Sequence, residues 1–306
     1  MRFVLAMKLA VDAMGEVMLD WRTILCGVDG SEESLHAAKL GAMIAKRLSS
    51  RLLGLCVIPY HQVFQLGIHR AQGEAELQAD ARALLNRIQN ETGFPIEQLI
   101  LEGEPAATIL DIAAKRSCEL IVVGRRGVSG VERWLLGSVV TKVVLHAAST
   151  VLVSKGYGAV ADTPFQRALC GLDGSIESER AGIESLGLVA LLGGTIRFAH
   201  VRNAVKGAEI GPPAGDDGST GTLLARFCEQ ARQAGIAADS VELEGQAAAA
   251  LLEHATAWDA SLIAVGTRGL GGFAGLRLGS TSHQIVEHCA CSVLLCPRRQ
   301  KPDGGK

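Results

Sequence analysis

Short, continuous runs of apolar residues alternate with longer amphipathic segments along the chain. In the first half, the apolar runs predict strands over residues 23–28, 51–58, 96–102, 119–124 and 150–154. The amphipathic segments between them predict helices over residues 32–48, 74–92, 105–116 and 138–147. Apolar runs without alternation are typical of strands buried on both faces. The pattern therefore predicts a parallel sheet with helices on both sides.

The second half of the chain repeats the sequence markers of the first half in the same order. Cys-Gly-Val-Asp-Gly-Ser, which ends at Ser31, returns as Cys-Gly-Leu-Asp-Gly-Ser, which ends at Ser175. Ile-Val-Val-Gly-Arg-Arg-Gly, which ends at Gly127, returns as Ile-Ala-Val-Gly-Thr-Arg-Gly, which ends at Gly269. The offset is 144 residues for the first motif and 142 for the second. Ordered markers at a nearly constant offset indicate an internal repeat.

The repeat predicts two tandem α/β/α sandwiches with five strands each. We expect them over residues 21–158 and 159–306, after an N-terminal extension of residues 1–20 to which we assign no function. Residues 207–221 of the second copy hold five glycines and two prolines, which predicts a mobile loop. Ser31 and Ser175 are followed by acidic residues, which indicates helix N-caps.

Composition narrows the classes of partner. Apolar residues make up 48% of the chain, charged residues 20% and aromatic residues 4%, and the net charge is −2. This balance predicts neither nucleic acid nor membrane as a partner. The eight cysteines show no paired zinc-ligand spacing, so we interpret Cys26, Cys170 and the Cys289–Cys291 pair as small buried side chains. The cysteine pattern and the poor fit of the N-terminus to a signal peptide favour a cytoplasmic protein.

Glycines at fixed spacing follow the fourth predicted strand of each copy. The first copy has the spacing Gly-x2-Gly-x9-Gly-Ser at Gly124, Gly127, Gly137 and Ser138; the second has it at Gly266, Gly269, Gly279 and Ser280. Glycine lets a backbone approach phosphate closely, and the amides of a helix N-terminus point at an anion. The two sets therefore predict phosphate-binding loops, although a tight strand-to-helix turn would need the same glycines.

Arginines lie inside both glycine motifs. Arg126 and Arg268 either add positive charge to the site or are solvated loop residues. Asp29 and Asp173, at the end of the first strand of each copy, could hold Mg²⁺ or could only orient a ribose. The spacer of the second copy contains Gly271, which together with its neighbouring glycines predicts unequal affinity of the two sites.

The Val-Asp-Gly-Ser strand end, the glycine motif and the closing Val-Leu-Val strand together resemble the ATP-binding branch of the universal stress protein family, in its tandem form. The resemblance implies the sheet order 3-2-1-4-5 and a pseudo-dimer in which the fifth strands of the two copies pair. It also implies sites for ATP, ADP or AMP. The implied contacts are to adenosine near Asp29 and Asp173, to adenine at Val57 and Val201, and to ribose and phosphates at the glycines, the serines and the adjacent Val139 and Thr281.

Catalytic motifs are scarce. The chain has no Gly-x4-Gly-Lys-Ser/Thr loop, no His-Glu-x2-His and no Gly-x-Ser-x-Gly. His146 and His288 occupy matching positions at helix ends, where a histidine interacts favourably with the helix dipole. We therefore predict a non-catalytic, adenine-nucleotide-binding stress-response protein. It has an unidentified protein partner, and homodimerisation is open. The alternatives are a slow ATPase and a nucleotide-independent scaffold with vestigial sites.

Overall fold

The computed structural model describes residues 19–60, 70–127, 136–202, 219–269 and 278–298, with the side chains of residues 70–71 and 219–220 left out. The chain divides into two compact units between Ala161 and Asp162. We refer to the unit that starts at Asp20 as copy one and to the unit that ends at Arg298 as copy two, and describe each by itself. Cys289 and Cys291, in copy two, have their Sγ atoms 3.2 Å apart, and all eight cysteines are free thiols.

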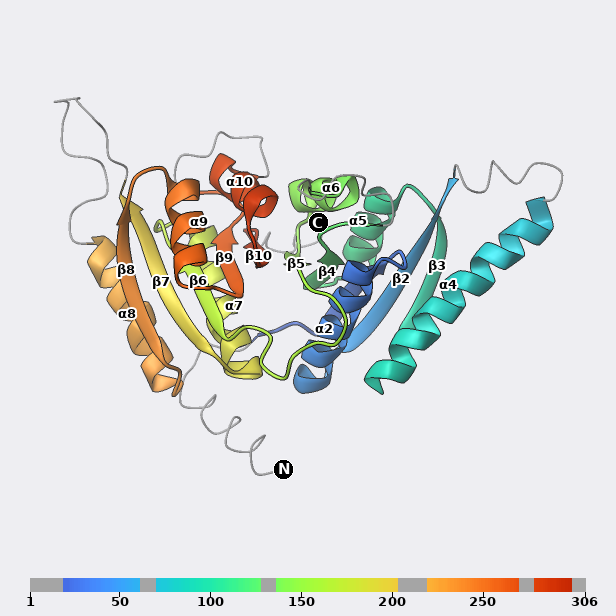
Figure 1. Cartoon of the computed structure of the whole chain (residues 1–306), viewed down its shortest axis with the longest axis horizontal. Helices are drawn as coiled ribbons and strands as arrows, with labels where there is room; N and C mark the ends of the chain where they lie inside the picture. Colours follow the sequence, from blue (N-terminus) through green and yellow to red (C-terminus); the bar gives the residue numbers. More distant parts are fainter. Residues whose placement is uncertain (1–18, 61–69, 128–135, 203–218, 270–277, 299–306) are drawn as a thin grey trace, which may run out of the picture. The chain divides into compact units, whose positions relative to one another are not determined.

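Copy one alternates strands with helices (Figure 1). Its elements are β1 (Thr23–Val28), α2 (Glu32–Leu48), β2 (Arg51–Pro59), α4 (Arg70–Thr92), β3 (Glu97–Gly103), α5 (Pro105–Lys115), β4 (Leu120–Gly124), α6 (Ser138–His146) and β5 (Thr150–Ser154). Each agrees with its predicted range to within one residue at either end, except that α4 begins at Arg70 rather than at residue 74.

The five strands of copy one form a parallel sheet in the order β3-β2-β1-β4-β5. Helices α2 and α4 pack on one face of this sheet, and α5 and α6 pack on the other. This confirms the predicted α/β/α sandwich and strand order. The chain leaves β1 toward β2 and leaves β4 toward β5, so the strand order reverses between β1 and β4. Open α/β sheets bind ligands at the carboxyl ends of the strands that flank such a reversal.

Copy two repeats this plan (Figure 1). Its elements are β6 (Arg167–Gly171), α7 (Ile176–Leu192), β7 (Thr195–Arg202), α8 (Ser219–Gln233), β8 (Ala238–Glu244), α9 (Ala247–Ala257), β9 (Leu262–Gly266), α10 (Ser280–His288) and β10 (Ser292–Cys296). The sheet order is β8-β7-β6-β9-β10, again parallel. The predicted loop over 207–221 is wrong for its last three residues, which belong to α8; the rest of it lies outside the described residues.

Burial follows position in the sheet. Every residue of β4 and β5 is buried, as are Ile24 to Cys26 in β1. Strands β3 and β8, at the end of each sheet, are mostly half-buried or exposed. The prediction that all strands are buried on both faces is therefore wrong for these two. Both strands carry charged and polar residues, such as Glu97 and Glu102 in β3 and Asp239 and Ser240 in β8, which remain exposed.

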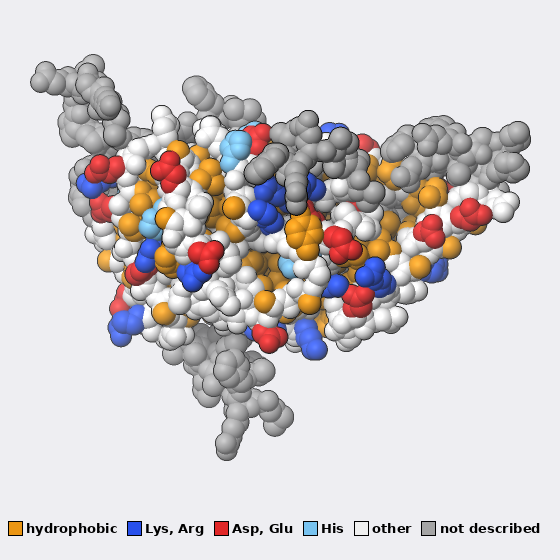
Figure 2. Space-filling model, viewed as in Figure 1, with side chains coloured by type: hydrophobic (Ala, Val, Ile, Leu, Met, Phe, Trp, Pro, Cys, Tyr) orange, Lys and Arg blue, Asp and Glu red, His pale blue; other side chains and the backbone are white. Residues whose placement is uncertain are grey.

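Cysteines lie mainly in the apolar core. Cys26 in β1 and Cys170 in β6 are buried, as predicted, and burial raises the pKa of each thiol to about 12. Most charged side chains lie outside the core, although Glu33 and Glu184 are buried. Figure 2 shows Lys and Arg side chains close to Asp and Glu side chains on the face drawn. Within the described ranges, no helix has the length and apolar character needed to cross a membrane.

Candidate functional site

Each aspartate at the end of a first strand is oriented by the serine two residues later. In copy one, the Ser31 hydroxyl and backbone N–H both donate to Asp29 Oδ1, at 2.7 and 3.0 Å. In copy two, Ser175 makes the same bonds to Asp173 Oδ1, at 2.6 and 3.0 Å. The serine oxygens also accept the N–H of the third following residue at 3.2 Å, which confirms both predicted N-caps.

The second glycine of each motif lies directly against this aspartate. A Cβ on Gly127 would lie 2.3 Å from Asp29 Oδ2, and a Cβ on Gly269 would lie 2.3 Å from Asp173 Oδ2. Only glycine brings the loop backbone this close to a carboxylate without a steric clash. The two predicted features of each site, an aspartate after the first strand and a glycine after the fourth, are thus in contact.

The first glycine of each motif packs the fourth strand against the helix that follows the first. A Cβ on Gly124 would lie 2.6 Å from the carbonyl carbon of Glu33, in the first turn of α2. A Cβ on Gly266 would lie 2.7 Å from the carbonyl carbon of Glu177, in the first turn of α7. These glycines set the close approach of strand and helix.

The third glycine of each motif closes the loop. Gly137 N–H donates to Arg125 O at 3.1 Å, and a Cβ on Gly137 would lie 3.7 Å from Gly127 N. In copy two, Gly279 N–H donates to Thr267 O at 2.6 Å. The intervening residues 128–135 and 270–277, which include Gly271, lie outside the described residues. In copy one the loop thus brings its second and third glycines together, and in copy two Gly279 lies against Thr267 and Arg268.

Helices α6 and α10 start at these third glycines without a capping side chain. Gly137 and Gly279 are the N-caps, and neither helix has a side-chain cap hydrogen bond. Helices α2 and α7, by contrast, are capped by Ser31 and Ser175. The first N–H groups of a helix have no intrahelical acceptor. The amides that follow Gly137 and Gly279, on Ser138, Val139, Ser280 and Thr281, therefore have the geometry to donate to an anion.

The predicted adenine contacts lie near the carboxyl ends of the strands, on the side where Asp29 and Asp173 follow the first strands. Val57 in β2 follows Cys56, which is in register with Val28, the last residue of β1. Val57 therefore lies next to the point where the chain leaves β1 toward Asp29. Val201 in β7 occupies the corresponding position in copy two, two residues beyond the Gly171–Ala199 pair. The matched histidines, by contrast, are the last residues of α6 and α10.

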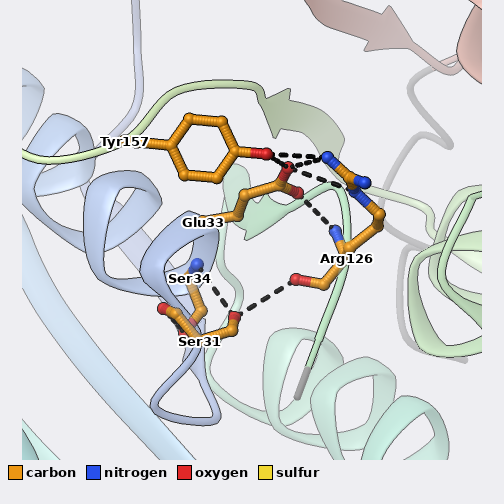
Figure 3. Close-up of polar contacts among 5 residues, drawn as sticks. All are labelled: Ser31, Glu33, Ser34, Arg126 and Tyr157. Atoms are coloured by element: carbon orange, nitrogen blue, oxygen red, sulfur yellow. Dashed lines mark hydrogen bonds and ion pairs between the residues drawn. The ribbon is translucent and has the colours of Figure 1, made fainter. Parts of the chain in front are cut away.

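Arg126 is held by residues that the motif did not predict (Figure 3). Its backbone N–H donates to Glu33 Oε2 at 2.7 Å, and its Nη2 donates to Glu33 Oε1 at 2.7 Å. The Tyr157 hydroxyl accepts from Arg126 Nη2 and donates to Glu33 Oε1, both at 2.7 Å. The Glu33 carboxylate raises the pKa of the Arg126 guanidinium through these hydrogen bonds. The interpretation of Arg126 as a solvated loop residue is therefore wrong.

Sequence reasoning missed Glu33 and Tyr157 as parts of this site. In the sequence, Glu33 is one of the acidic residues that follow the N-cap Ser31, and it does lie in the first turn of α2. Nothing in the pattern around Tyr157 distinguishes it from other linker residues, and it is 59% exposed. Tyr157 lies in the segment between β5 and β6, so its contact with Glu33 and Arg126 is seen only in the folded chain.

In each copy, the aspartate and the loop glycine that lies against it form what we call a cradle, Asp29 with Gly127 and Asp173 with Gly269. The model of the universal stress protein family matches residues 20–155 and again residues 164–297. The chain belongs to the universal stress protein family. Because the family model matches twice, the chain is a tandem member, as the internal repeat predicted.

Similar proteins cover one or both copies. A universal stress protein of Mycolicibacterium smegmatis is 30% identical over 285 residues, which cover 89% of this chain and 96% of that protein. A universal stress protein of Methanocaldococcus jannaschii is 34% identical over 143 residues, covering 44% of this chain and 82% of that protein. The crystal structure of a universal stress protein from Archaeoglobus fulgidus has a TM-score of 0.70 at 23% identity, covering 92% of this chain and all of that one. The last comparison shows the shared fold.

Proposed function

We propose that each copy binds one adenine nucleotide, ATP or its hydrolysis products ADP and AMP, and that the protein acts as a nucleotide-dependent stress regulator rather than as an enzyme. The observation that carries this proposal is the contact of Gly127 with Asp29 and its repetition by Gly269 and Asp173. Each contact places a hydrogen-bond acceptor, the carboxylate, beside a loop backbone that offers hydrogen-bond donors.

The two kinds of group match the two polar parts of a nucleotide. A carboxylate accepts hydrogen bonds from ribose hydroxyls, whereas backbone N–H groups at a helix N-terminus donate to phosphate oxygens. In copy one, Asp29 would supply the carboxylate, Gly127 the N–H of the loop, and Ser138 and Val139 the N–H groups at the start of α6. Copy two offers Asp173, Gly269, Ser280 and Thr281 in the same places. Backbone groups of Val57 and Val201 would meet the adenine base.

Serine holds each carboxylate in place before a ligand arrives. Because Ser31 donates twice to Asp29 Oδ1, Asp29 presents its Oδ2 toward Gly127. A preorganised acceptor loses less freedom on binding than a solvated one. This favours a binding role for the aspartate. If Mg²⁺ accompanies the phosphates, Oδ2 is the oxygen of Asp29 that would face it.

The first test counts the nucleotide that the protein carries. Gently purified full-length protein is denatured, and the released nucleotides are identified and counted by chromatography and mass spectrometry. Two adenine nucleotides per chain are expected, or uptake of two when ATP and Mg²⁺ are added to protein that has lost them. The Gly127→Ala, Gly269→Ala double variant is the matched control, because both cradles then carry a clashing methyl group. Wild-type protein that binds no nucleotide under either condition would overturn the proposal in favour of a scaffold.

Two further readouts separate a regulator from an enzyme and locate the response. Prolonged incubation with ATP should leave ATP intact, whereas steady accumulation of ADP that both glycine variants abolish would indicate a slow ATPase. Occupancy should slow hydrogen exchange at the amides that follow Gly137 and Gly279. This would change the surface offered to a partner protein. Unchanged exchange at saturating ATP would contradict that mechanism.

A further inference from the structure

Glu33, Arg126 and Tyr157 form a hydrogen-bonded triangle in copy one, which we call the arginine clasp (Figure 3). The Glu33 carboxylate accepts from both the backbone N–H and the guanidinium of Arg126, and Tyr157 bonds to both partners. Arg126 lies between the first two glycines of the motif. Both copies have an arginine at this position, Arg126 in copy one and Arg268 in copy two. The clasp therefore fixes the cationic side chain that the two motifs have in common.

Burial makes this ion pair persistent. The Glu33 side chain is 4% exposed and the Arg126 side chain is 19% exposed. A shielded carboxylate is costly to leave without its cation, so the pair has a strong tendency to stay closed. The positive charge of Arg126 is thereby balanced within the protein before any phosphate approaches.

The start of the linker carries Tyr157 to this pair. His36 Nδ1 and Ser154 Oγ, at the end of β5, lie 3.0 Å apart and link α2 to the last strand. The next residues pass over the His36 ring so closely that a Cβ on Gly156 would lie 2.4 Å from it. A side chain at this position would clash with the His36 ring. The next residue, Tyr157, reaches Glu33 in the first turn of α2. The segment that leaves β5 is therefore a built part of the copy-one site.

Copy two lacks the clasp. Glu177 and Arg268 occupy the positions of Glu33 and Arg126, but no hydrogen bond or ion pair joins them. Among the residues that the structure describes, none places a carboxylate on the Arg268 guanidinium. After β10 the chain is held differently, since Arg180 donates to Pro297 O and pairs with Glu184 at 2.7 Å. Arg180 stands where copy one has His36.

We propose that Glu33 and Tyr157 are positioning residues that set the phosphate-charge preference of the copy-one site by keeping Arg126 neutralised. Copy two, whose Arg268 has no carboxylate partner in the described chain, then favours a polyphosphate over a monophosphate more strongly than copy one does. The two sites would thus sense different members of the adenine-nucleotide pool. This inference rests on the proposed function, because it concerns the same two sites.

The test compares ATP with AMP at each site separately in the full-length chain. Gly269→Ala silences copy two, and Gly127→Ala silences copy one, each by placing a methyl group 2.3 Å from the aspartate. Calorimetric titration then gives the ATP-to-AMP affinity ratio of the remaining site. We expect this ratio to be about tenfold higher for copy two than for copy one, as one additional unbalanced charge near the phosphates would produce.

Releasing the clasp should move copy one toward copy two. In the Gly269→Ala background, Glu33→Gln should raise the ATP-to-AMP ratio about tenfold, and Tyr157→Phe should raise it less, by about threefold. Glu33→Asp, which keeps the charge, should leave the ratio near its original value. Adding Arg126→Gln to Glu33→Gln should cancel the rise, because the released charge is then absent. A purely structural role would lower both affinities together and leave the ratio unchanged.

Glu177→Gln in the Gly127→Ala background is the matched control. Since Glu177 makes no bond to Arg268, its substitution should not move the copy-two ratio. A copy-one ratio that stays constant in both Glu33→Gln and Tyr157→Phe would overturn the clasp while leaving nucleotide binding intact. Wild-type protein that binds neither nucleotide would instead overturn the proposed function. If Glu33→Gln does not fold, Tyr157→Phe decides alone, because Tyr157 is 59% exposed and its loss leaves the core intact.

Discussion

Copies one and two make the same backbone contacts at their cradles, whereas the side chains around the cradles differ. Gly127 and Gly269 approach their aspartates to the same distance, and both aspartates are held by a serine two residues later. Within the part of the chain that the structure describes, the clasp is present in copy one and absent from copy two, and it depends on a residue that follows β5. Contacts made through glycine tolerate no substitution, but a side-chain partner can be lost without changing the loop. We infer that nucleotide binding is common to the copies and that its tuning is not.

The largest expected effect is on stability and should be equal in the two copies. Gly124→Ala and Gly266→Ala each place a methyl group 2.6 to 2.7 Å from a helix backbone. Because backbone cannot move aside as a flexible side chain does, each should lower the free energy of unfolding by about 3 kcal/mol. Denaturant titration followed by circular dichroism measures this.

Gly221→Ala is the control for these two variants. Gly221 lies in α8, and a Cβ there would meet no atom within 4 Å. Its substitution should stabilise the chain by up to about 1 kcal/mol, since alanine is the better helix former. A large loss in only one of Gly124→Ala and Gly266→Ala would show that the copies pack differently after all.

The next effect concerns binding and should separate the copies. Gly127→Ala displaces the Asp29 carboxylate, and Gly269→Ala displaces that of Asp173. Each should weaken nucleotide binding at its own site about a hundredfold or more, which equals about 2.8 kcal/mol. Equilibrium dialysis should then show one tight site per chain instead of two. Loss of both sites in either single variant would mean that the copies bind as one unit.

Removing an N-cap should have a smaller effect, again matched between copies. Ser31→Ala and Ser175→Ala each remove the 3.2 Å bond to the third following N–H and the hydroxyl bond to the aspartate. The backbone N–H bond to the aspartate remains in both variants. Each should cost about 1 kcal/mol of stability. Threonine at either position should restore most of it. Thermal unfolding of the four variants measures this, and a threonine variant no better than alanine would contradict the capping role.

The smallest expected effect is a pH dependence that arises at His36 in copy one. Burial lowers the pKa of His36 below 6.5, and Lys39 lowers it further, against an opposing effect of Glu33. The folded chain therefore binds fewer protons at His36 than the unfolded chain does, so the free energy of unfolding falls as the pH drops below 6.5. Arg180 stands in the same position of copy two, so copy two has no imidazole there.

Comparing wild type with His36→Gln isolates this contribution. The variant should lose less stability between neutral and mildly acidic pH than wild type does, in denaturant titrations across that range. His254 also has a pKa lowered by burial, so His254→Gln serves as the reference for a copy-two histidine. Parallel pH profiles of wild type and His36→Gln would show that Ser154 accommodates the protonated ring.

The repeat and the hydrophobic pattern predicted most of the fold. Strands β1 and β5 have the predicted bounds, because a continuous apolar run specifies a buried strand wherever it occurs. The half-exposed β3 differs from them, because its polar residues, such as Glu97 and Glu102, remain exposed. The pattern also did not predict the start of α8 inside a glycine-rich segment, because glycine is a poor helix former.

The sequence by itself determined two tandem α/β copies, the positions of the glycine motifs and the serine caps. These features are local: each follows from residues within one turn, strand or helix. Only the tertiary structure decided that Glu33 balances Arg126 and that Tyr157 completes the clasp, across sequence separations of 93 and 124 residues. Such contacts depend on where the sheet order and the linker carry each side chain. A long-range ion pair leaves no periodic trace in the sequence, so it becomes visible only in the folded chain.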